Sequence, residues 1–401
     1  MDGLLGNDHL DSSSTMKGLP LHLLDDILFR LEPKSLAMMR CTDRYFKSHI
    51  SDDPMFEIGY FSRAVPSLLH ICSFIVTYVY FQPFASSWDA MSEGTFKFRN
   101  LCSLFGSSSG LLLLYINGLF VANPLTKRFR FLDHSGSILL SRIVGGFNVR
   151  FQDHLRAMCV GFVVNPTTKR FKIVCILEMQ KRCRFEISDG DSWRLSKTTI
   201  TDDSKSDLTR YMKPVYLHST LHWLRNDVSI IAFNPETEQG RFIPSTFHRE
   251  EDMKLLFAAD DKTNCLTLIS GTKETISFYT LLRKPKWTLA RQIKNVSMED
   301  DIVLDWNMVT YDGTRLVVRV LMKYAFGVLF HVYDMEADSW GVLGSATKWR
   351  SHRSWNSYIF TPSFFPVEED AHNYKALVAS EEDDPRIFYL RAVMGIIGTT
   401  K

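Results

Sequence analysis

The pair His218 and His222 comes nearest to a metal-binding motif in this chain of 401 residues. Two histidines four residues apart can bind one metal ion when both lie on the same face of a helix. The apolar residues around them instead favour two strands joined by a turn at Ser219 and Thr220. No Glu follows His218 directly and no third ligand is near, so we expect no metal here.

Cysteine usage and motif content give no other sign of catalysis. The seven cysteines form no Cys-x-x-Cys pair, and their odd number argues against a disulfide framework or a zinc site. They favour a reducing compartment, so we expect the protein in the nucleus or the cytoplasm. The sequence has no phosphate-binding loop, dinucleotide fingerprint, nucleophile elbow or zinc-protease motif, and we expect no cofactor and no catalytic residue. A Ser, His and Asp triad assembled from distant segments stays open, because proximity is not visible in a sequence.

Three basic clusters, at residues 127–130, 169–172 and 181–184, place Lys and Arg beside a Phe or a Cys. Such clusters can contact phosphates and bases, but they also suit exposed hairpin tips with one side chain turned inward. The first two occupy equivalent positions of a short repeat, which favours the structural explanation. Because the formal net charge is only +2, we expect no nucleic-acid partner.

The elements that carry these residues begin with a small all-α domain. We expect a flexible leader at residues 1–16 and a helical domain at residues 17–62. Apolar residues at helical spacing predict a helix that starts at Pro20 and ends at Pro33. A second helical stretch follows and ends near residues 51–54. No signal peptide is visible and no apolar run is long enough to span a bilayer, so we expect no membrane association.

An all-β domain is expected at residues 66–395, where short β-rich runs alternate with turn residues. A weak repeat is centred on Asn123, Asn165, Asn234 and Asp334. In each copy the Asn or Asp begins a hairpin turn with its side chain, and an aromatic residue six positions later anchors the returning strand. The Asn234 copy has its aromatic residue eight positions later, which indicates an insertion of two.

The spacing of the repeat favours a propeller. Its first two copies are 42 residues apart, and the aromatic anchors Trp193, Phe242, Trp287 and Trp340 follow at spacings of 49, 45 and 53. Periods of about 40–50 residues with four short strands are typical of propeller blades. The domain has room for six or seven blades, and a pair of two-sheet sandwiches is the structural alternative.

Residues 19–36 resemble the F-box. The segment opens with Leu19-Pro20, continues with Leu and Ile at helical spacing, and runs through Arg30-Leu31 and Pro33 to Lys34-Ser35-Leu36. Arg40-Cys41 and Phe46 then continue the family pattern. The sequence departs from that pattern at Glu32, at Thr42-Asp43 and at Phe46, where the family commonly has Trp.

The rest of the chain resembles the plant F-box-associated domains, some of which are related to kelch-type propellers. The segments that carry this resemblance are residues 106–114, 123–127, 185–193 and 217–224, and it becomes diffuse past residue 345. In the 217–224 segment the usual glycine of the turn is missing.

Together these resemblances imply an adaptor. The helical domain would dock on the Skp adaptor of a cullin-based ubiquitin ligase, and the β domain would hold a target, most simply a protein. The face shared between the domain's own core and the Skp surface would consist of Leu19, Pro20, Leu24, Ile27, Leu28, Leu31, Pro33 and Leu36. The resemblance implies no substrate-binding residues. The alternatives are a kelch-like copper oxidase, which needs a Tyr, His and Cys metal site, and a scaffold that binds Skp without forming a ligase.

Overall fold

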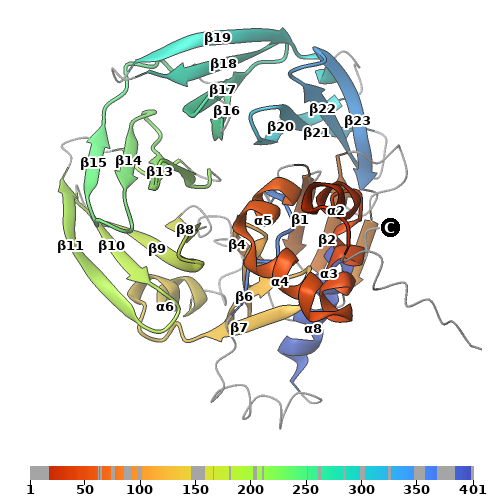
Figure 1. The fold of residues 1–401 in the computed structure, drawn as a ribbon. Helices are drawn as coiled ribbons and strands as arrows, with labels where there is room; N and C mark the ends of the chain where they lie inside the picture. The colour runs from red at the N-terminus through yellow and green to blue at the C-terminus, as the bar shows by residue number, and fades with distance from the viewer. Residues whose placement is uncertain are drawn as a thin grey trace, which may run out of the picture.

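A computed structural model describes residues 18–61, 63, 66–73, 77–84, 92–96, 102–145, 159–165, 167–179, 182–201, 206–209, 212–250, 252–260, 263–282, 286–298, 303–323, 327–346, 357–367 and 384–398. The expected leader at residues 1–16 lies outside these ranges. The chain forms a small N-terminal helical module and a ring of β-sheets, on which the module sits (Figure 1).

The helical module contains four helices, α2 (Leu21–Leu28), α3 (Pro33–Thr42), α4 (Arg44–Asp52) and α5 (Pro54–Phe61). Pro33 begins α3 as expected, whereas Pro20 is the N-cap of α2 rather than its first helical residue. The predicted single second helix is wrong, because Asp43 adopts an extended conformation between α3 and α4. Its carboxylate accepts a hydrogen bond from the Tyr45 amide and so caps the start of α4.

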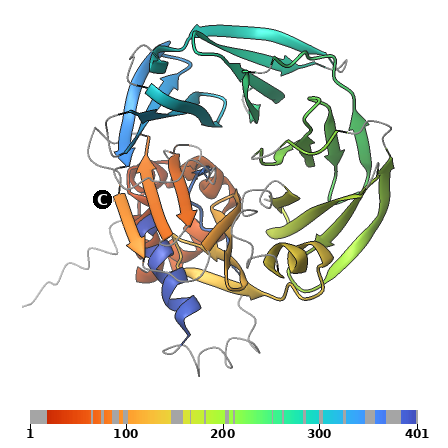
Figure 2. The same cartoon turned by 180° about the vertical axis from the view of Figure 1, so that it is seen from behind.

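Six antiparallel four-stranded sheets form the ring, and we call them blades one to six (Figures 1 and 2). The strands of each blade are given in order from the centre outward. Blade one contains β24 (Ser357–Phe360), β1 (Ser67–Ser73), β2 (Thr77–Pro83) and β3 (Ser92–Phe96), blade two contains β4 (Cys102–Ser108), β5 (Leu111–Ile116), β6 (Leu119–Asn123) and β7 (Arg128–Leu132), and blade three contains β8 (Val160–Asn165), β9 (Arg170–Met179), β10 (Arg182–Ser188) and β11 (Trp193–Thr201). Blade four contains β12 (Val215–Leu217), β13 (Thr220–Leu224), β14 (Ile230–Phe233) and β15 (Gly240–Ile243), blade five contains β16 (Lys254–Asp260), β17 (Cys265–Gly271), β18 (Thr275–Leu281) and β19 (Trp287–Lys294), and blade six contains β20 (Val303–Tyr311), β21 (Arg315–Met322), β22 (Val328–Asp334) and β23 (Ser339–Ala346).

This architecture confirms the propeller prediction, fixes the number of blades at six and excludes the two-sheet sandwich pair. The ring is closed by strand exchange between the two ends of the β domain. Strand β24 pairs antiparallel with β1, and His70 lies opposite Ser357. Blade one therefore takes its innermost strand from near the C-terminus and its other three from near the start of the domain.

The predicted hairpin turn is confirmed at all four copies. Oδ1 of Asn123 accepts hydrogen bonds from the amides of Leu125 and Thr126. Asn165, Asn234 and Asp334 make the same two bonds to the residues two and three positions ahead. The short polar side chain thus satisfies the turn's amides, as expected for a turn that begins with Asn or Asp.

One detail of the repeat was wrong. The Asn234 turn has no insertion, because Phe233 pairs with Gly240 in the same way that Ala122 pairs with Phe129. Gly240 takes the place of the aromatic residue, and Phe242 lies further along β15. A Cβ at position 240 would approach side-chain atoms of Ile200 in the neighbouring blade to 2.9 Å, so a larger side chain there would require Ile200 to shift.

The four copies of the repeat do not occupy equivalent places in their blades. The turns at Asn123, Asn234 and Asp334 join the third and fourth strands of a blade, whereas the Asn165 turn joins the first and second strands of blade three. The spacing of 42 residues is therefore not a blade period. The anchors Trp193, Phe242, Trp287 and Trp340 do recur once per blade, on the outermost strands β11, β15, β19 and β23.

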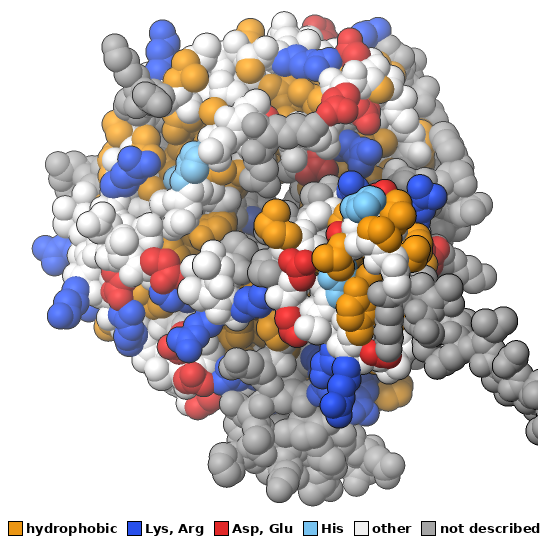
Figure 3. Space-filling view, in the orientation of Figure 1, with side chains coloured by type: hydrophobic (Ala, Val, Ile, Leu, Met, Phe, Trp, Pro, Cys, Tyr) orange, Lys and Arg blue, Asp and Glu red, His pale blue; other side chains and the backbone are white. Residues whose placement is uncertain are grey.

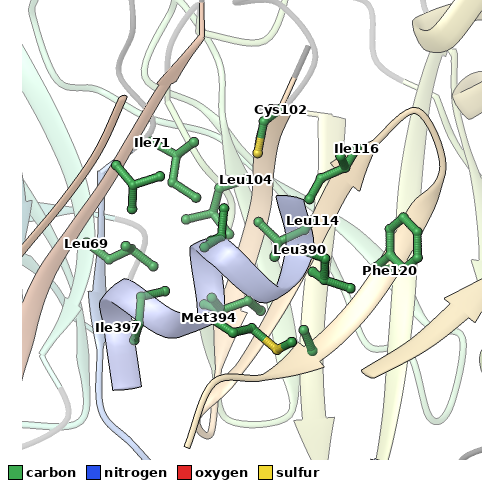
Figure 4. Close-up of a cluster of buried hydrophobic side chains, with 14 of the residues drawn as sticks. Leu69, Ile71, Cys102, Leu104, Leu114, Ile116, Phe120, Leu390, Met394 and Ile397 are labelled. Carbon is green, nitrogen blue, oxygen red and sulfur yellow. The ribbon is translucent and has the colours of Figure 1, made fainter. Parts of the chain in front are cut away.

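Two further helices within the described ranges support the ring. Helix α8 (Pro385–Gly398), which the sequence analysis did not predict, packs Leu390, Met394 and Ile397 into the core shared by blades one and two (Figure 4). Helix α6 (Ile138–Gly145) begins at the buried carboxylate of Glu186. This carboxylate accepts hydrogen bonds from the Ser137 hydroxyl at 2.7 Å and from the amides of residues 138 and 139.

Candidate functional site

The core of the helical module is complete without a partner protein. Leu24 and Leu28 of α2 are fully buried, one turn apart, and pack with side chains of the other three helices. The buried members of this cluster are Leu24, Leu28, Leu36, Phe46, Ile50, Phe56, Tyr60 and Phe364. Polar contacts add to the packing, since Nε2 of His49 lies 2.7 Å from Oδ1 of Asp25 and the Tyr60 hydroxyl donates to the carbonyl of Leu31.

Large apolar side chains nevertheless remain on the outside of the module. Five are well exposed, and we call them the apolar surface: Leu21 (58%), Leu23 (43%), Ile27 (38%), Met38 (62%) and Met55 (74%). Leu23 and Ile27 are one helical turn apart, so they lie on the same side of α2, next to the buried stripe. Figure 3 shows hydrophobic side chains gathered on this module. Exposed apolar patches of this kind are typical of protein-binding sites.

The eight residues of the predicted docking face are divided between the inside and the outside of the module. Leu24, Leu28 and Leu36 are fully buried, and their side chains are not available for contact with a partner. Ile27 and Pro20 are exposed, and Leu19, Leu31 and Pro33 are partly exposed. Whether any of them contacts a partner stays a prediction. Four exposed residues of the apolar surface were not part of the predicted face: Leu21, Leu23, Met38 and Met55. Leu23 nevertheless belongs to the apolar helical pattern of the first helix.

Contacts with the ring hold the module in place. The ring of Phe364, which follows β24, packs edge to face on Phe61 at 5.3 Å between centroids. The Arg40 guanidinium lies 4.4 Å from the centroid of the same Phe364 ring. Nζ of Lys169, at the β8–β9 hairpin tip, lies 2.9 Å from the Glu57 carboxylate of α5. The position of the apolar surface relative to the ring is therefore set by aromatic packing and by an ion pair.

The two histidines considered for metal binding, His218 and His222, differ in burial. His218 is exposed in a two-residue turn with Ser219, and both have a positive φ, of 50° and 57°. The turn thus lies one residue earlier than predicted, and Thr220 already belongs to β13. His222 is buried in β13, where burial lowers its pKa to about 4. Within the described ranges, no three His, Cys, Asp or Glu side chains group as metal ligands, and no helix is long and apolar enough to cross a membrane.

Two of the basic clusters take part in ion pairs between neighbouring parts of the ring. The Arg130 guanidinium pairs with Asp191, and Nζ of Lys172 lies 2.6 Å from the Glu236 carboxylate. Together with the Lys169–Glu57 pair, these contacts link blade two to blade three, blade three to blade four, and blade three to the helical module. Their positive charges are therefore partly balanced within the protein.

Comparisons with known proteins identify the family. No protein-family model matches the chain. An F-box/kelch-repeat protein of Arabidopsis thaliana is 56% identical over the full length of both chains, and an F-box protein of the same plant is 64% identical over 71% of this chain and 95% of its own. A further Arabidopsis F-box protein is 45% identical over 87% of this chain and 85% of its own.

Among solved structures, a fungal lectin described as a six-bladed β-propeller aligns at a TM-score of 0.36 with 8% identity, over 72% of this chain and 97% of its own. Sequence identity carries the assignment. With 56% identity to an Arabidopsis relative over the full chain, a helical module at its N-terminus and a six-bladed ring behind it, the chain belongs to the plant F-box/kelch-repeat proteins.

Proposed function

We propose that the chain is the substrate-recognition subunit of a Skp–cullin–F-box ubiquitin ligase. The helical module docks on the Skp adaptor, and the propeller holds a target. The observation that carries this proposal is the apolar surface, since five large apolar side chains remain exposed on a module whose core is already closed. Burying exposed apolar area against a partner is the main driving force of association.

The mechanism is proximity. Ubiquitin transfer is carried out by other subunits, so the chain needs only to bind at both ends and hold the target at a fixed position. The contacts of Phe364 and the Lys169–Glu57 pair support such a rigid arrangement, because they fasten the module to the ring. Loops of the propeller supply the specificity for the target. A nuclear or cytoplasmic location is part of the proposal, and fractionation of tagged protein tests it.

The test is a binding titration of the full chain with a purified Skp adaptor. Ile27→Asp and Leu23→Asp place a charge in the apolar surface without entering the core. Each is expected to weaken binding at least tenfold, because an ionised carboxylate buried against a partner without its own counter-charge costs more than the about 1.4 kcal/mol that corresponds to that factor. Leu289→Asp is the matched control, because Leu289 is 51% exposed on the outermost strand of blade five.

The results separate docking from folding. A change such as Leu24→Asp is uninformative, because Leu24 is fully buried and a charge there unfolds the module. If the folded wild-type chain does not bind the Skp adaptor, or if Ile27→Asp and Leu23→Asp bind as well as Leu289→Asp, the docking proposal is refuted. Binding of Skp without recruitment of a cullin would instead identify a scaffold.

A further inference from the structure

A cavity of about 730 Å³ occupies the central channel of the propeller. Its wall is formed by the innermost strands β4, β12, β16, β20 and β24 and by the segment that leads into β12. In the space-filling view an opening lies near the centre of the ring, beside the helical module (Figure 3). The volume falls in the range of about 300–1,000 Å³ that is usual for small-molecule sites.

Lys213 reaches across this channel. It precedes β12 of blade four, yet its Nζ lies 3.6 Å from the centroid of the Tyr358 ring in β24 of blade one. These blades stand opposite each other, with two blades between them on either side. No carboxylate among the described residues pairs with Lys213, and burial lowers its pKa to about 7.

The charged groups of the wall, with Lys213 included, leave a small positive excess. Nζ of Lys254 lies 2.9 Å from one oxygen of the Asp305 carboxylate, and the Arg319 guanidinium lies 3.0 Å from the other. The Asp305 carboxylate thus contacts both cations, and the Arg319 side chain is only 3% exposed. Arg249, Asp252 and Asp312 also line the cavity, so with Lys213 the wall holds four cations against three carboxylates. An anion placed there would be attracted by the remaining positive charge when Lys213 is protonated.

Two polar groups complete the wall. The His70 imidazole is buried behind Ser357, with Nδ1 at 2.7 Å from the Ser357 hydroxyl. Burial and the charges of Arg319 and Lys213 hold the pKa of His70 well below its usual value, so the imidazole is neutral. Thr209 also lines the cavity, and its buried hydroxyl has no hydrogen-bond partner among the described residues. A buried hydroxyl without a partner is costly and is expected to bind something polar.

We propose that this cavity binds a small anionic metabolite that carries a carboxylate or phosphate group. Lys213 and Arg319 would contact its negative charge, and Thr209 would donate a hydrogen bond to one of its oxygens. An apolar ligand of the same size would leave the buried Thr209 hydroxyl without a partner among the described residues. The inference is independent of the docking role, because none of these residues belongs to the helical module.

Anion binding should be coupled to protonation of Lys213. The Tyr358 ring contacts its ammonium. The charged groups of the same wall are Arg249, Asp252, Asp312, Arg319 and the Lys254–Asp305 pair, and the neutral His70 lies behind Ser357. A bound anion adds a negative charge and raises the pKa of Lys213 above about 7. The protein then takes up a large part of one proton per site at pH 8 and much less at pH 6, where the amine is already charged.

The experiment is isothermal titration calorimetry of the full chain with citrate and with inorganic phosphate, at constant ionic strength. Titrations in two buffers with different ionisation enthalpies give the number of protons taken up. We expect saturable binding of at least one probe, with proton uptake at pH 8 that falls at pH 6. Because the two probes carry the two anionic groups, their relative affinities show which group the site prefers.

Three variants make the test specific. Lys213→Gln is expected to weaken binding at least tenfold and to abolish the proton uptake. Thr209→Val removes only the unpaired hydroxyl, so it should fold normally and bind several-fold more weakly; it carries the test if Lys213→Gln does not fold. Lys197→Gln, at an exposed position of β11, should behave as wild type. Failure of both probes to bind the folded wild-type chain, or binding unchanged in Lys213→Gln and Thr209→Val, overturns the proposal.

Discussion

Asn123 offers the sharpest test of how the C-terminal segment is held on the ring. Its side chain is fully buried, and both the oxygen and the nitrogen of its amide group form hydrogen bonds. Oδ1 accepts from the turn amides of Leu125 and Thr126, while Nδ2 donates to the carbonyls of Ser363 and Phe365 at 3.0 and 2.9 Å. Asn123→Asp keeps the shape and the turn bonds, but it places a second oxygen against two carbonyl oxygens.

The expected cost depends on pH. The new carboxyl group is buried between acceptors, so its folded pKa rises above the unfolded value of about 3.9. Keeping it protonated at pH 7 costs at most about 4 kcal/mol, and the acid can restore only one of the two lost bonds, each worth about 1 kcal/mol. We therefore expect a destabilisation of about 3–5 kcal/mol at pH 7, in line with the cost of an unpaired buried charge. Near pH 4, where the unfolded chain is also protonated, only about 1–2 kcal/mol should remain.

Asn165→Asp is the matched control. Asn165 makes the same two turn bonds, no described residue accepts from its Nδ2, and a natural Asp occupies the equivalent place at Asp334. Its destabilisation should stay below about 0.5 kcal/mol, as for most surface substitutions. Urea unfolding of both variants at pH 7 and pH 4 provides the comparison. Equal losses in the two variants at pH 7, or a loss at Asn123 that does not shrink at pH 4, would refute this reasoning.

Three other substitutions or truncations test separate parts of the fold. Glu186→Gln replaces the carboxylate that accepts three hydrogen bonds at the start of α6. We expect it to lower the unfolding free energy by about 2–3 kcal/mol and to speed amide hydrogen exchange in that helix. Unchanged exchange would contradict the role assigned to Glu186. Gly110→Ala should lower the unfolding free energy by about 2–4 kcal/mol, because Gly110 has a φ of 75° and its Cβ would lie 2.5 Å from the Ser363 amide nitrogen; a neutral result would mean that this contact relaxes. Removal of residues 384–401 deletes α8 and exposes the core beneath Leu390. We therefore expect the truncated chain to bind more of a hydrophobic dye. No increase in dye binding would mean that α8 does not protect that core.

Local physics explains what could be predicted from the sequence. The first helix of the module and the strands around the four Asn or Asp turns follow from spacing and turn chemistry alone. The outer aromatic anchors, such as Trp193 and Trp340, also indicated the blade period, because they recur on the outermost strands of successive blades. The break at Asp43 was not predicted, although Asp is one of the residues most favoured at a helix N-cap, because the apolar residues on both sides keep a helical spacing.

Non-local contacts could not be predicted. The turn at Asn165 has the same residues as the turn at Asn123, so their different places in a blade are invisible until the strands are paired. At the proposed docking surface, periodicity locates an apolar stripe but not its limits, and the exposure of Met38 and Met55 depends on how α3 and α5 pack. The channel cluster is beyond sequence reasoning altogether, because Lys213, Arg319 and His70 come from three separate blades or their linkers.

The closure of the ring by β24 has a consequence for the order of events during synthesis. His70 of β1 meets Ser357 of β24 across 287 residues of chain. At a translation rate of about 5–20 residues per second, the inner edge of β1 stays open for roughly 15–60 s, a long time for an unpaired edge in a crowded cell. The core of the helical module is also completed late, because Phe364 is part of it. A chain that stops short of this segment therefore lacks both a closed ring and Phe364 in the core of the module. Under the docking proposal, the chain would bind the Skp adaptor only once the polypeptide is nearly complete.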